Sequence, residues 1–483
     1  MMRRERADRL VGQFVLSQRP ADLPPGWSVR ERQGWALATH SKLPVAEVVT
    51  PGGAPIGWIA GFPVGRDAVA PPRVEFPESA GADPAALEAA LYRLGGRFVG
   101  VFLTDRLARV YLDPCGSLAA VYSEARPAVA ATPSLLDGAE HPWDEPLIRL
   151  LGMPESGQWY PFGLTPRAGV RRLIPNHFLD LRAWAPQRHW PSGPIAPDER
   201  ADAAVQRILD TIRATIATVA RAFPLHMSLT AGRDSRLLLA CAREQLGRVR
   251  FFTFGRERET ADTHIARKLA RRFGLDHAIL PIEPARPEQA AAWLERVGYC
   301  VSGDIARSHP TLRHLDPRRA LLPGMAGEVG RAFYWRDGDG PATRLSAEDV
   351  VARCALPAGD RIAAAAARWL AELSDQSAFT ILDLLYVEQR LGCWGGPQQY
   401  GGDEFSACQL FPLAHRDIFA ATLALPAGYR LGEQLVLDAC RASWPELLDY
   451  PFNEFAGLQR YPRRIAKSVY YAGRRALAGL RRR

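Results

Sequence analysis

The second half of the chain alternates short apolar runs with longer segments whose apolar residues recur at helical spacing. Ile265, Leu269 and Phe273, for example, fall on one face of a helix. The pattern predicts helices over 200–222, 234–246 and 261–273, and strands over 224–229, 249–254 and 278–281. Strands that alternate with helices are typical of a parallel α/β sheet. Beyond residue 345 the pattern is mainly helical and begins at a capping box, Ser346 to Asp349.

The first two hundred residues show a different pattern, in which short β-type runs are separated by Pro and Gly. Residues 97–104 and 108–113 predict a hairpin, and a third run covers 119–122. A proline-rich stretch at 186–197 is interpreted as a linker. The change predicts two domains, over residues 1–190 and 198–483, of mixed α+β and α/β class.

Charge is concentrated at one end of the chain. The 483 residues carry a formal net charge of +9, and the segment 460–483 is rich in Arg and Lys without an acid. Its apolar residues recur at helical spacing, which predicts a basic amphipathic helix. This tail is either a solvated helix end or a binding site for an anionic membrane surface or acidic partner. The nearly neutral remainder argues against nucleic-acid binding.

Other residue classes restrict the chemistry. The seven cysteines include no C-x-x-C pair, and the ten histidines form no metal-binding cluster. No apolar run approaches the roughly 20 residues of a membrane-spanning helix. The N-terminus carries no apolar run typical of a signal peptide. We therefore expect a cytoplasmic protein in a reducing environment.

One loop carries recognisable chemistry. Between the first predicted strand of the second half and its helix stands the sequence S-L-T-A-G-R-D-S-R, residues 228–236. Small residues let such a backbone turn tightly and direct its N–H groups at phosphate oxygens, and the helix adds its positive end. The alternative interpretation is a capped helix that follows a buried strand. The candidate pyrophosphate contacts in this loop are Ser228, Thr230, Ala231, Gly232, Arg233, Asp234 and Ser235.

This loop resembles the S-G-G-x-D-S pyrophosphate loop of the N-type ATP pyrophosphatases. Segments 253–255, 261–277, 304–307 and 322–328 follow in an order similar to that of the asparagine synthetase family. In the N-terminal half, residues 96–102 and 112–122 resemble the core of the family's class II glutaminase. The resemblance implies an N-terminal-nucleophile-hydrolase-like β-sandwich, followed by a parallel-sheet ATP pyrophosphatase domain with a helical C-terminus.

The resemblance also implies an activity and a set of site residues. The expected reaction is the ATP-dependent, AMP-forming synthesis of an amide bond from a small-molecule or peptide carboxylate, as in β-lactam synthetases and lasso-peptide cyclases. Phe254 and Gly324 become further ATP contacts, and Asp234 and Glu328 become Mg²⁺ ligands. Asp304 and Arg307 lie on a segment that resembles a substrate loop of the family.

The sequence departs from the family at several positions. Met2 and Arg3 stand where the glutaminase has its cysteine, and the first cysteine is Cys115, so we do not expect glutamine hydrolysis. Met325 and Gln434 stand where relatives have a general base and a lysine. The candidate catalytic residues that replace them are Arg390, or Arg233 and Arg236, for positive charge, and Glu388 or Tyr334 as base. A catalytically impaired ATP-binding or scaffold protein is the alternative function.

Overall fold

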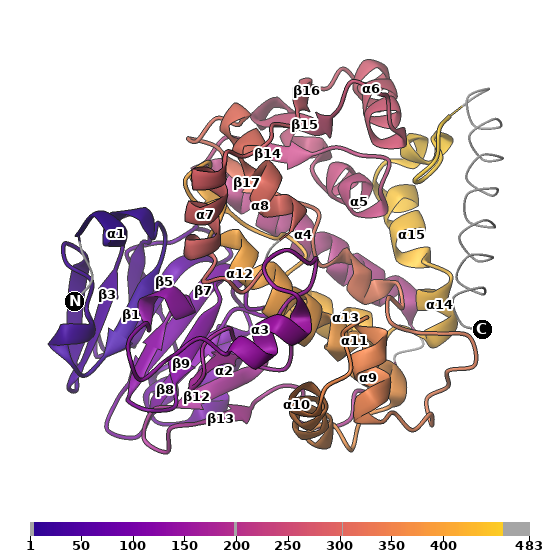
Figure 1. Ribbon diagram of the computed structural model, residues 1–483. Coiled ribbons are helices and arrows are strands. Elements are labelled where there is room, and N and C mark those ends of the chain that lie inside the picture. Colours follow the sequence, from indigo (N-terminus) through magenta and orange to yellow (C-terminus); the bar gives the residue numbers. More distant parts are fainter. Residues whose placement is uncertain (1–3, 198–199, 302, 457–483) are drawn as a thin grey trace, which may run out of the picture.

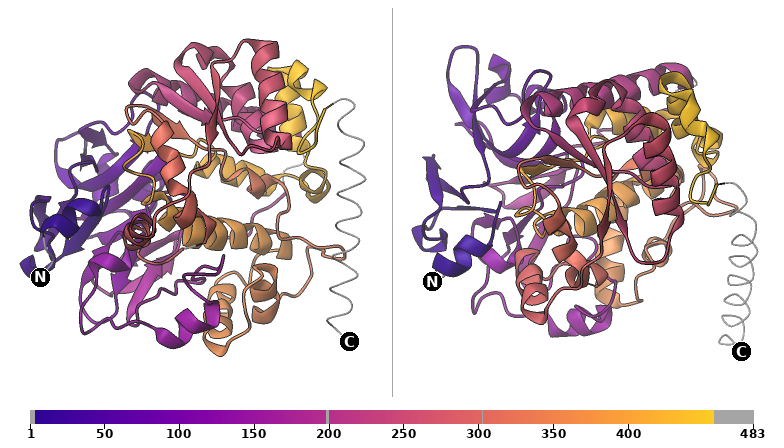
Figure 2. Two further views of the ribbon diagram at one scale, coloured as in Figure 1. Left: turned by 45° about the horizontal axis from the view of Figure 1, so that its top comes forward. Right: turned by 90° about the horizontal axis from the view of Figure 1, so that it is seen from above.

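The computed structural model describes residues 4–197, 200–301 and 303–456. Two largely antiparallel sheets form the N-terminal part, and a parallel sheet with its helices follows (Figure 1). In Figure 2 the N-terminal sheets lie to one side of the molecule and the parallel sheet with its helices to the other. The chain therefore combines antiparallel and parallel sheets in the mixed α/β class that the pattern predicts. The predicted basic helix at 460–483 lies outside the described residues.

The N-terminal part contains a six-stranded sheet of order β11-β9-β10-β1-β3-β2 and a seven-stranded sheet of order β13-β12-β8-β7-β5-β4-β6. The strands of the first are β1 (Phe14–Ser17), β2 (Ser28–Arg32), β3 (Trp35–Thr39), β9 (Ala120–Ser123), β10 (Ala128–Ala130) and β11 (Val170–Leu173). Those of the second are β4 (Val45–Val49), β5 (Pro55–Val64), β6 (Arg73–Glu75), β7 (Gly95–Leu103), β8 (Ala108–Leu112), β12 (His177–Asp180) and β13 (Ala185–Arg188). The helices here are α1 (Arg4–Arg9), α2 (Pro84–Leu91) and α3 (Glu145–Leu151).

Strand β7 explains why the two sheets form a sandwich. Successive side chains of a strand point to opposite faces, and every residue of β7 is buried. Val99 and Val101 join a core shared with the six-stranded sheet, while Phe98 and Phe102 join a second core with Leu87 of α2. The predicted hairpin is confirmed, because β7 pairs antiparallel with β8.

The interpretation of residues 186–197 as a linker is wrong for their first part. Ala185–Arg188 form β13, which pairs antiparallel with β12. The strand lies at the edge of its sheet. An edge strand tolerates Pro186, because a proline there removes no interior hydrogen bond of the ladder.

The second half forms a five-stranded parallel sheet of order β16-β15-β14-β17-β18. Its strands are β14 (Leu225–Ser228), β15 (Val249–Gly255), β16 (His277–Pro281), β17 (Ala320–Leu322) and β18 (Cys408–Gln409). The helices between the first three are α4 (Ala201–Ala222), α5 (Arg233–Cys241) and α6 (Ala261–Phe273). The predicted alternation is confirmed, although the helix expected to reach 246 ends at Cys241 and a 3₁₀ turn follows.

This strand order has a functional consequence. The chain runs from β14 outward to β16, then returns to add β17 on the other side of β14. The connections that follow β14 and β17 therefore start side by side at the carboxyl edge of the sheet and lead to strands on opposite sides. Open α/β sheets bind ligands at such a switch point.

The helices that follow complete the fold. They are α7 (Pro287–Arg296), α8 (Asp304–Ser308), α9 (Ala347–Arg353), α10 (Asp360–Ala371), α11 (Ala378–Leu384), the π-helix η7 (Leu385–Gly395), α12 (Gly396–Gln399), α13 (Arg416–Ala424), α14 (Ala427–Leu431) and α15 (Gln434–Ser443). The capping box at Ser346 and Asp349 is confirmed. Among the described residues, no helix combines the length and apolar character that a membrane crossing needs.

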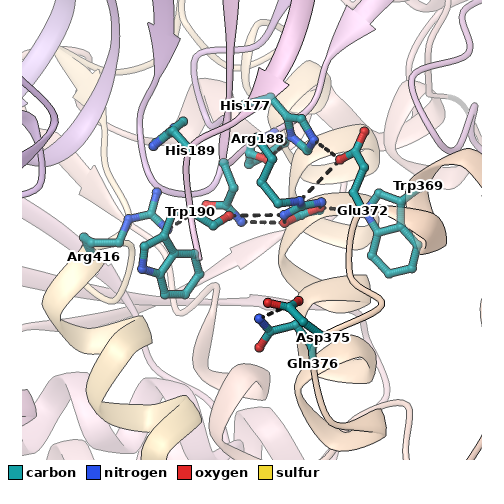
Figure 3. A network of polar contacts seen from close by, with 12 residues as sticks. His177, Arg188, His189, Trp190, Trp369, Glu372, Asp375, Gln376 and Arg416 are labelled. Carbon is teal, nitrogen blue, oxygen red and sulfur yellow. Dashed lines mark hydrogen bonds and ion pairs between the residues drawn. The ribbon is translucent and has the colours of Figure 1, made fainter. Parts of the chain in front are cut away.

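A buried ion pair joins the two halves of the chain. Arg188 of β13 donates to both carboxylate oxygens of Glu388 on η7, at 2.6 and 2.9 Å. Asn176 and Trp369 donate to the same carboxylate at 2.7 and 2.6 Å. Figure 3 shows Arg188 and Trp369 in the same network of polar contacts. Glu388 has no exposed surface. These donors, rather than water, therefore stabilise its negative charge.

The position of Glu388 corrects its predicted role. We expected a general base, but its four hydrogen bonds and full burial leave no route for a substrate proton. Although burial opposes ionisation, the charge of Arg188 and these hydrogen bonds hold the pKa of Glu388 below its ordinary value. A carboxylate stabilised in this way is a weak proton acceptor. Glu388 is a structural anchor.

We expect Glu388→Gln to destabilise the protein strongly. The substitution leaves Arg188 buried without its counter-charge, and loss of one partner of a buried pair costs about 3–5 kcal/mol. The matched control is Glu372→Gln, because Glu372 also contacts Arg188, at 3.3 Å, but its side chain is 44% exposed. Its loss should cost at most about 1 kcal/mol. Urea unfolding followed by circular dichroism measures both, and equal losses would contradict the anchoring role.

Candidate functional site

The loop after β14 is held in shape by its own hydroxyl groups. Thr230 Oγ1 lies 2.8 Å from Ser235 Oγ and accepts from the Gly232 N–H at 3.0 Å. Asp262, at the start of α6, accepts from the Ala231 N–H at 3.0 Å. Helix α5 begins at Arg233, directly after Gly232. The predicted phosphate loop thus joins a strand end to a helix N-terminus, which is the arrangement that anion binding needs.

The loop after β17 lies directly against Asp234. A Cβ atom added to Gly327 would be 2.0 Å from Asp234 Oδ1, and one added to Gly324 would be 3.1 Å from Asp234 Cβ. Any side chain at position 327 would therefore collide with the carboxylate. The absence of a side chain at these two glycines lets the loops from β14 and β17 meet. The contact places Gly324, a predicted ATP contact, beside the phosphate loop.

Two carboxylates and one arginine occupy the space between these loops. Arg331 Nη2 lies 2.9 Å from Asp234 Oδ2 and 3.2 Å from Glu328 Oε1. Tyr386 of η7 donates to Glu328 Oε2 at 2.7 Å. The two predicted Mg²⁺ ligands are thus brought together, and Arg331 bridges them.

The surroundings of Asp234 disfavour the ionised form of its carboxyl group. Burial, followed by the negative charge of Glu328, raises the pKa of Asp234 to about 7, although Arg331 and Arg233 oppose the shift. Asp234 Oδ1 is buried without a hydrogen-bond partner. A buried carboxylate in this state favours the approach of a further cation.

These residues fit a magnesium ion. Mg²⁺ takes carboxylate oxygens and usually completes its shell with water and phosphate oxygens. Asp234 and Glu328 provide hard oxygen donors beside the phosphate loop, and Asp234 Oδ1 lacks a partner. In the described part of the chain no cluster of three or more His, Cys, Asp or Glu residues could hold a metal. A metal at this site would therefore depend on phosphate oxygens as well.

A cavity of about 460 Å³ opens beside the loops. Ser228, Thr230 and Phe254, which were predicted to contact ATP, line it. Met325 lines it from the second loop. The cavity therefore follows the carboxyl edge of the parallel sheet from β15 across β14 to β17.

The two other predicted catalytic residues are less suited to their roles. Tyr334 is 8% exposed, and burial raises the pKa of its hydroxyl well above the ordinary value. A phenol in this state is a poor general base. The Arg390 guanidinium stacks on Trp394, with Cζ 3.9 Å from the ring centroid. Neither residue is among those that line the cavity.

The predicted substrate residues lie on α8. Ile305 and Ser308 of this helix line the cavity, whereas Arg307 is exposed. Asp304 begins the helix. The helix thus borders the cavity, but the cavity lining does not include the arginine that we expected there.

The basic residues at the start of α5 have different partners. Arg236 is fully buried and donates to the carbonyl oxygens of Leu447, Tyr450 and Pro451. Burial lowers its pKa to about 10. Arg233 pairs with Glu433 at 2.5 Å. Arg236 is therefore a structural residue that ties the C-terminal segment to α5, rather than a phosphate ligand.

Sequence reasoning missed Arg331, Tyr386, Asp262 and Gly327. A signal existed for Arg331, because residues three positions apart share a helical face and Arg331 stands three residues after Glu328. Gly327 belonged to the predicted acidic loop but was not singled out. Tyr386 and Asp262 reach the site only through tertiary packing.

We expect Gly327→Ala to weaken MgATP binding by at least about tenfold, because its Cβ would displace the second loop from Asp234. Gly247→Ala is the matched control, since nothing lies within 4 Å of a Cβ at that position. Isothermal titration calorimetry measures the affinity, and circular dichroism checks folding. Unchanged affinity in the Gly327 variant would contradict the assigned contact between the loops.

The comparison with known families agrees with this geometry. Residues 208–320, from α4 to the start of β17, match the family model described as asparagine synthase. No curated protein matches the chain. The matched segment contains the phosphate loop and Asp234. This match supports membership of the asparagine synthetase family, and it indicates a domain of the ATP-dependent amide ligase type over residues 208–320.

Proposed function

We propose that this protein is an AMP-forming amide-bond synthetase. A substrate carboxylate oxygen attacks the α-phosphorus of ATP, the bond to the β-phosphate breaks, and an acyl-adenylate and pyrophosphate form. An amine then attacks the acyl carbon and loses a proton, and AMP leaves. The observation that carries the proposal is the contact between Asp234 and Gly327, which brings two loops together at the switch point of the sheet.

Each part of the site has a role in this reaction. The N-terminus of α5 and the hydroxyls of Thr230 and Ser235 face the phosphates. A Mg²⁺ ion held by Asp234 and Glu328 would neutralise phosphate charge. Arg331 adds a fixed positive charge beside both carboxylates. Arg331 would supply the positive charge near the phosphates, a role that we first assigned to Arg390, or to Arg233 and Arg236.

The proposal includes no glutamine hydrolysis by a cysteine of this sequence. All seven cysteines are buried and unpaired. Burial raises the pKa of Cys115, the first of them, well above its ordinary value, with the charge of Asp113 adding to the shift. The amine therefore comes from a substrate. The N-terminal sandwich is proposed to be a glutaminase-like domain that has lost its nucleophile, and the free thiols favour a reducing cytoplasmic setting.

Two observations favour the alternative, a catalytically impaired ATP-binding or scaffold protein. Arg331 already contacts both carboxylates that would hold the metal. Met325 lines the cavity where relatives are expected to carry a proton acceptor. A protein of this kind would bind ATP without breaking it.

ATP–pyrophosphate exchange with pooled carboxylates separates the two functions. We expect Mg²⁺-dependent exchange by the wild type and at least about a hundredfold loss in Asp234→Asn, which removes a charge at the metal site. The matched control, Asp210→Asn, removes a carboxylate on α4 whose side chain is 61% exposed, and should retain full exchange. ATP binding without exchange would favour the scaffold function, and equal exchange in both variants would contradict the site.

A further inference from the structure

Three glutamine side chains line the same cavity as the phosphate loop. Gln398 and Gln399 lie at the end of α12, and Gln409 lies on β18. We call these three residues the glutamine wall. The amide oxygen of each is buried and has no hydrogen-bond partner. Buried polar atoms are nearly always satisfied in proteins, so three unsatisfied acceptors in one cavity point to a ligand.

Gln399 defines what this ligand must provide. Its side-chain nitrogen donates to the Gly395 carbonyl at 2.9 Å, which fixes the orientation of the amide. Its oxygen is therefore an acceptor that requires an N–H or O–H donor. The residue is only 3% exposed, so bulk solvent does not satisfy it.

His309 adds a further acceptor to the lining of the same cavity. Burial lowers its pKa, so the ring is neutral near pH 7. Its Nδ1 lies 3.0 Å from the Ala306 carbonyl and donates to it, which leaves Nε2 as an acceptor. The ring stacks beside Trp293, with centroids 6.2 Å apart. The lining of the cavity thus combines acceptors with an aromatic surface.

The charge of the lining limits the ligand further. Among the described residues that line the cavity there is no Lys or Arg. Asp262 is the one carboxylate in that lining, and it already accepts from the Ala231 N–H. A second carboxylate on the substrate would be buried here without a counter-charge, which is strongly unfavourable.

We infer that the glutamine wall receives the body of the carboxylate substrate and selects an uncharged group that presents N–H or O–H donors. A carboxamide or a set of hydroxyls provides this chemistry, whereas an apolar chain or a second carboxylate does not. The inference rests on the proposed function only in assigning the ligand as the substrate to be activated. The acceptors themselves do not depend on it.

Binding without ATP tests the inference separately from catalysis. Isothermal titration calorimetry on the full chain compares the binding of four small-molecule probes: N-acetylglutamine, gluconate, hexanoate and glutarate. We expect N-acetylglutamine or gluconate to bind at least about tenfold more tightly than hexanoate and glutarate, which is the size of one lost hydrogen bond. The first two probes distinguish carboxamide from hydroxyl donors.

Variants locate the preference at the glutamine wall. In Gln399→Leu, the donor-bearing probes should bind no more tightly than hexanoate and glutarate. The control Gln206→Leu, at an exposed glutamine, should retain the wild-type preference for the donor-bearing probes. Gly402→Ala keeps Gln399 and places a Cβ 3.0 Å from Gln409 Oε1, so it should also weaken binding of the donor-bearing probe. This second variant tests the site if Gln399→Leu does not fold.

Three results would overturn the inference: equal or tighter binding of hexanoate or glutarate, no binding of either donor-bearing probe, or an unchanged preference in both folded variants. Failure of the proposed function looks different. In that case ATP–pyrophosphate exchange is absent while the preference for donor-bearing probes persists.

Discussion

The burial of the Asp234 carboxylate against the backbone of Gly327 is the constraint that organises the site. One carboxylate oxygen is enclosed without a partner, and the other is held by Arg331. The negative charge is costly there, as the raised pKa of Asp234 indicates. Positive charge is therefore favoured at the point where the loops from β14 and β17 meet. On the proposed function, a metal-bound phosphate would bring the cation that the carboxylate lacks.

The π-helix η7 links this site to the N-terminal sandwich. Tyr386 contacts Glu328 at the site, and Glu388, two residues later, is held by Arg188 and Asn176 from the other half of the chain. Residues two apart on a helix point in different directions, so η7 contacts both regions at once. Tyr400 continues this contact after α12 by donating to the Ala119 carbonyl at 2.6 Å. The sandwich thus supports the helix that positions the second carboxylate.

Much of the parallel sheet was predictable, because the signals for its strands and helices are local. The alternation of apolar strands and amphipathic helices predicted β14 to β16 with α4 to α6, and the small residues of the phosphate loop predicted the turn between β14 and α5. The catalytic assignments were weaker. Glu388 and Tyr334 were chosen by residue type, but burial and partners decide whether such groups can exchange protons. Neither property can be read from their sequence neighbours.

The sequence by itself predicted the strands β14 to β16 with the helices between them, the turn after β14, and the resemblance to the asparagine synthetase family that the match at residues 208–320 supports. Each of these depends on residues close together in the chain, where spacing alone sets which face or turn they occupy. The tertiary structure alone decided that Arg331 bridges Asp234 and Glu328, that Glu388 anchors the two halves, and that Gln398, Gln399 and Gln409 share a cavity. These contacts join segments distant in sequence. They arise from how strands and helices pack, and that packing cannot be read from local sequence patterns.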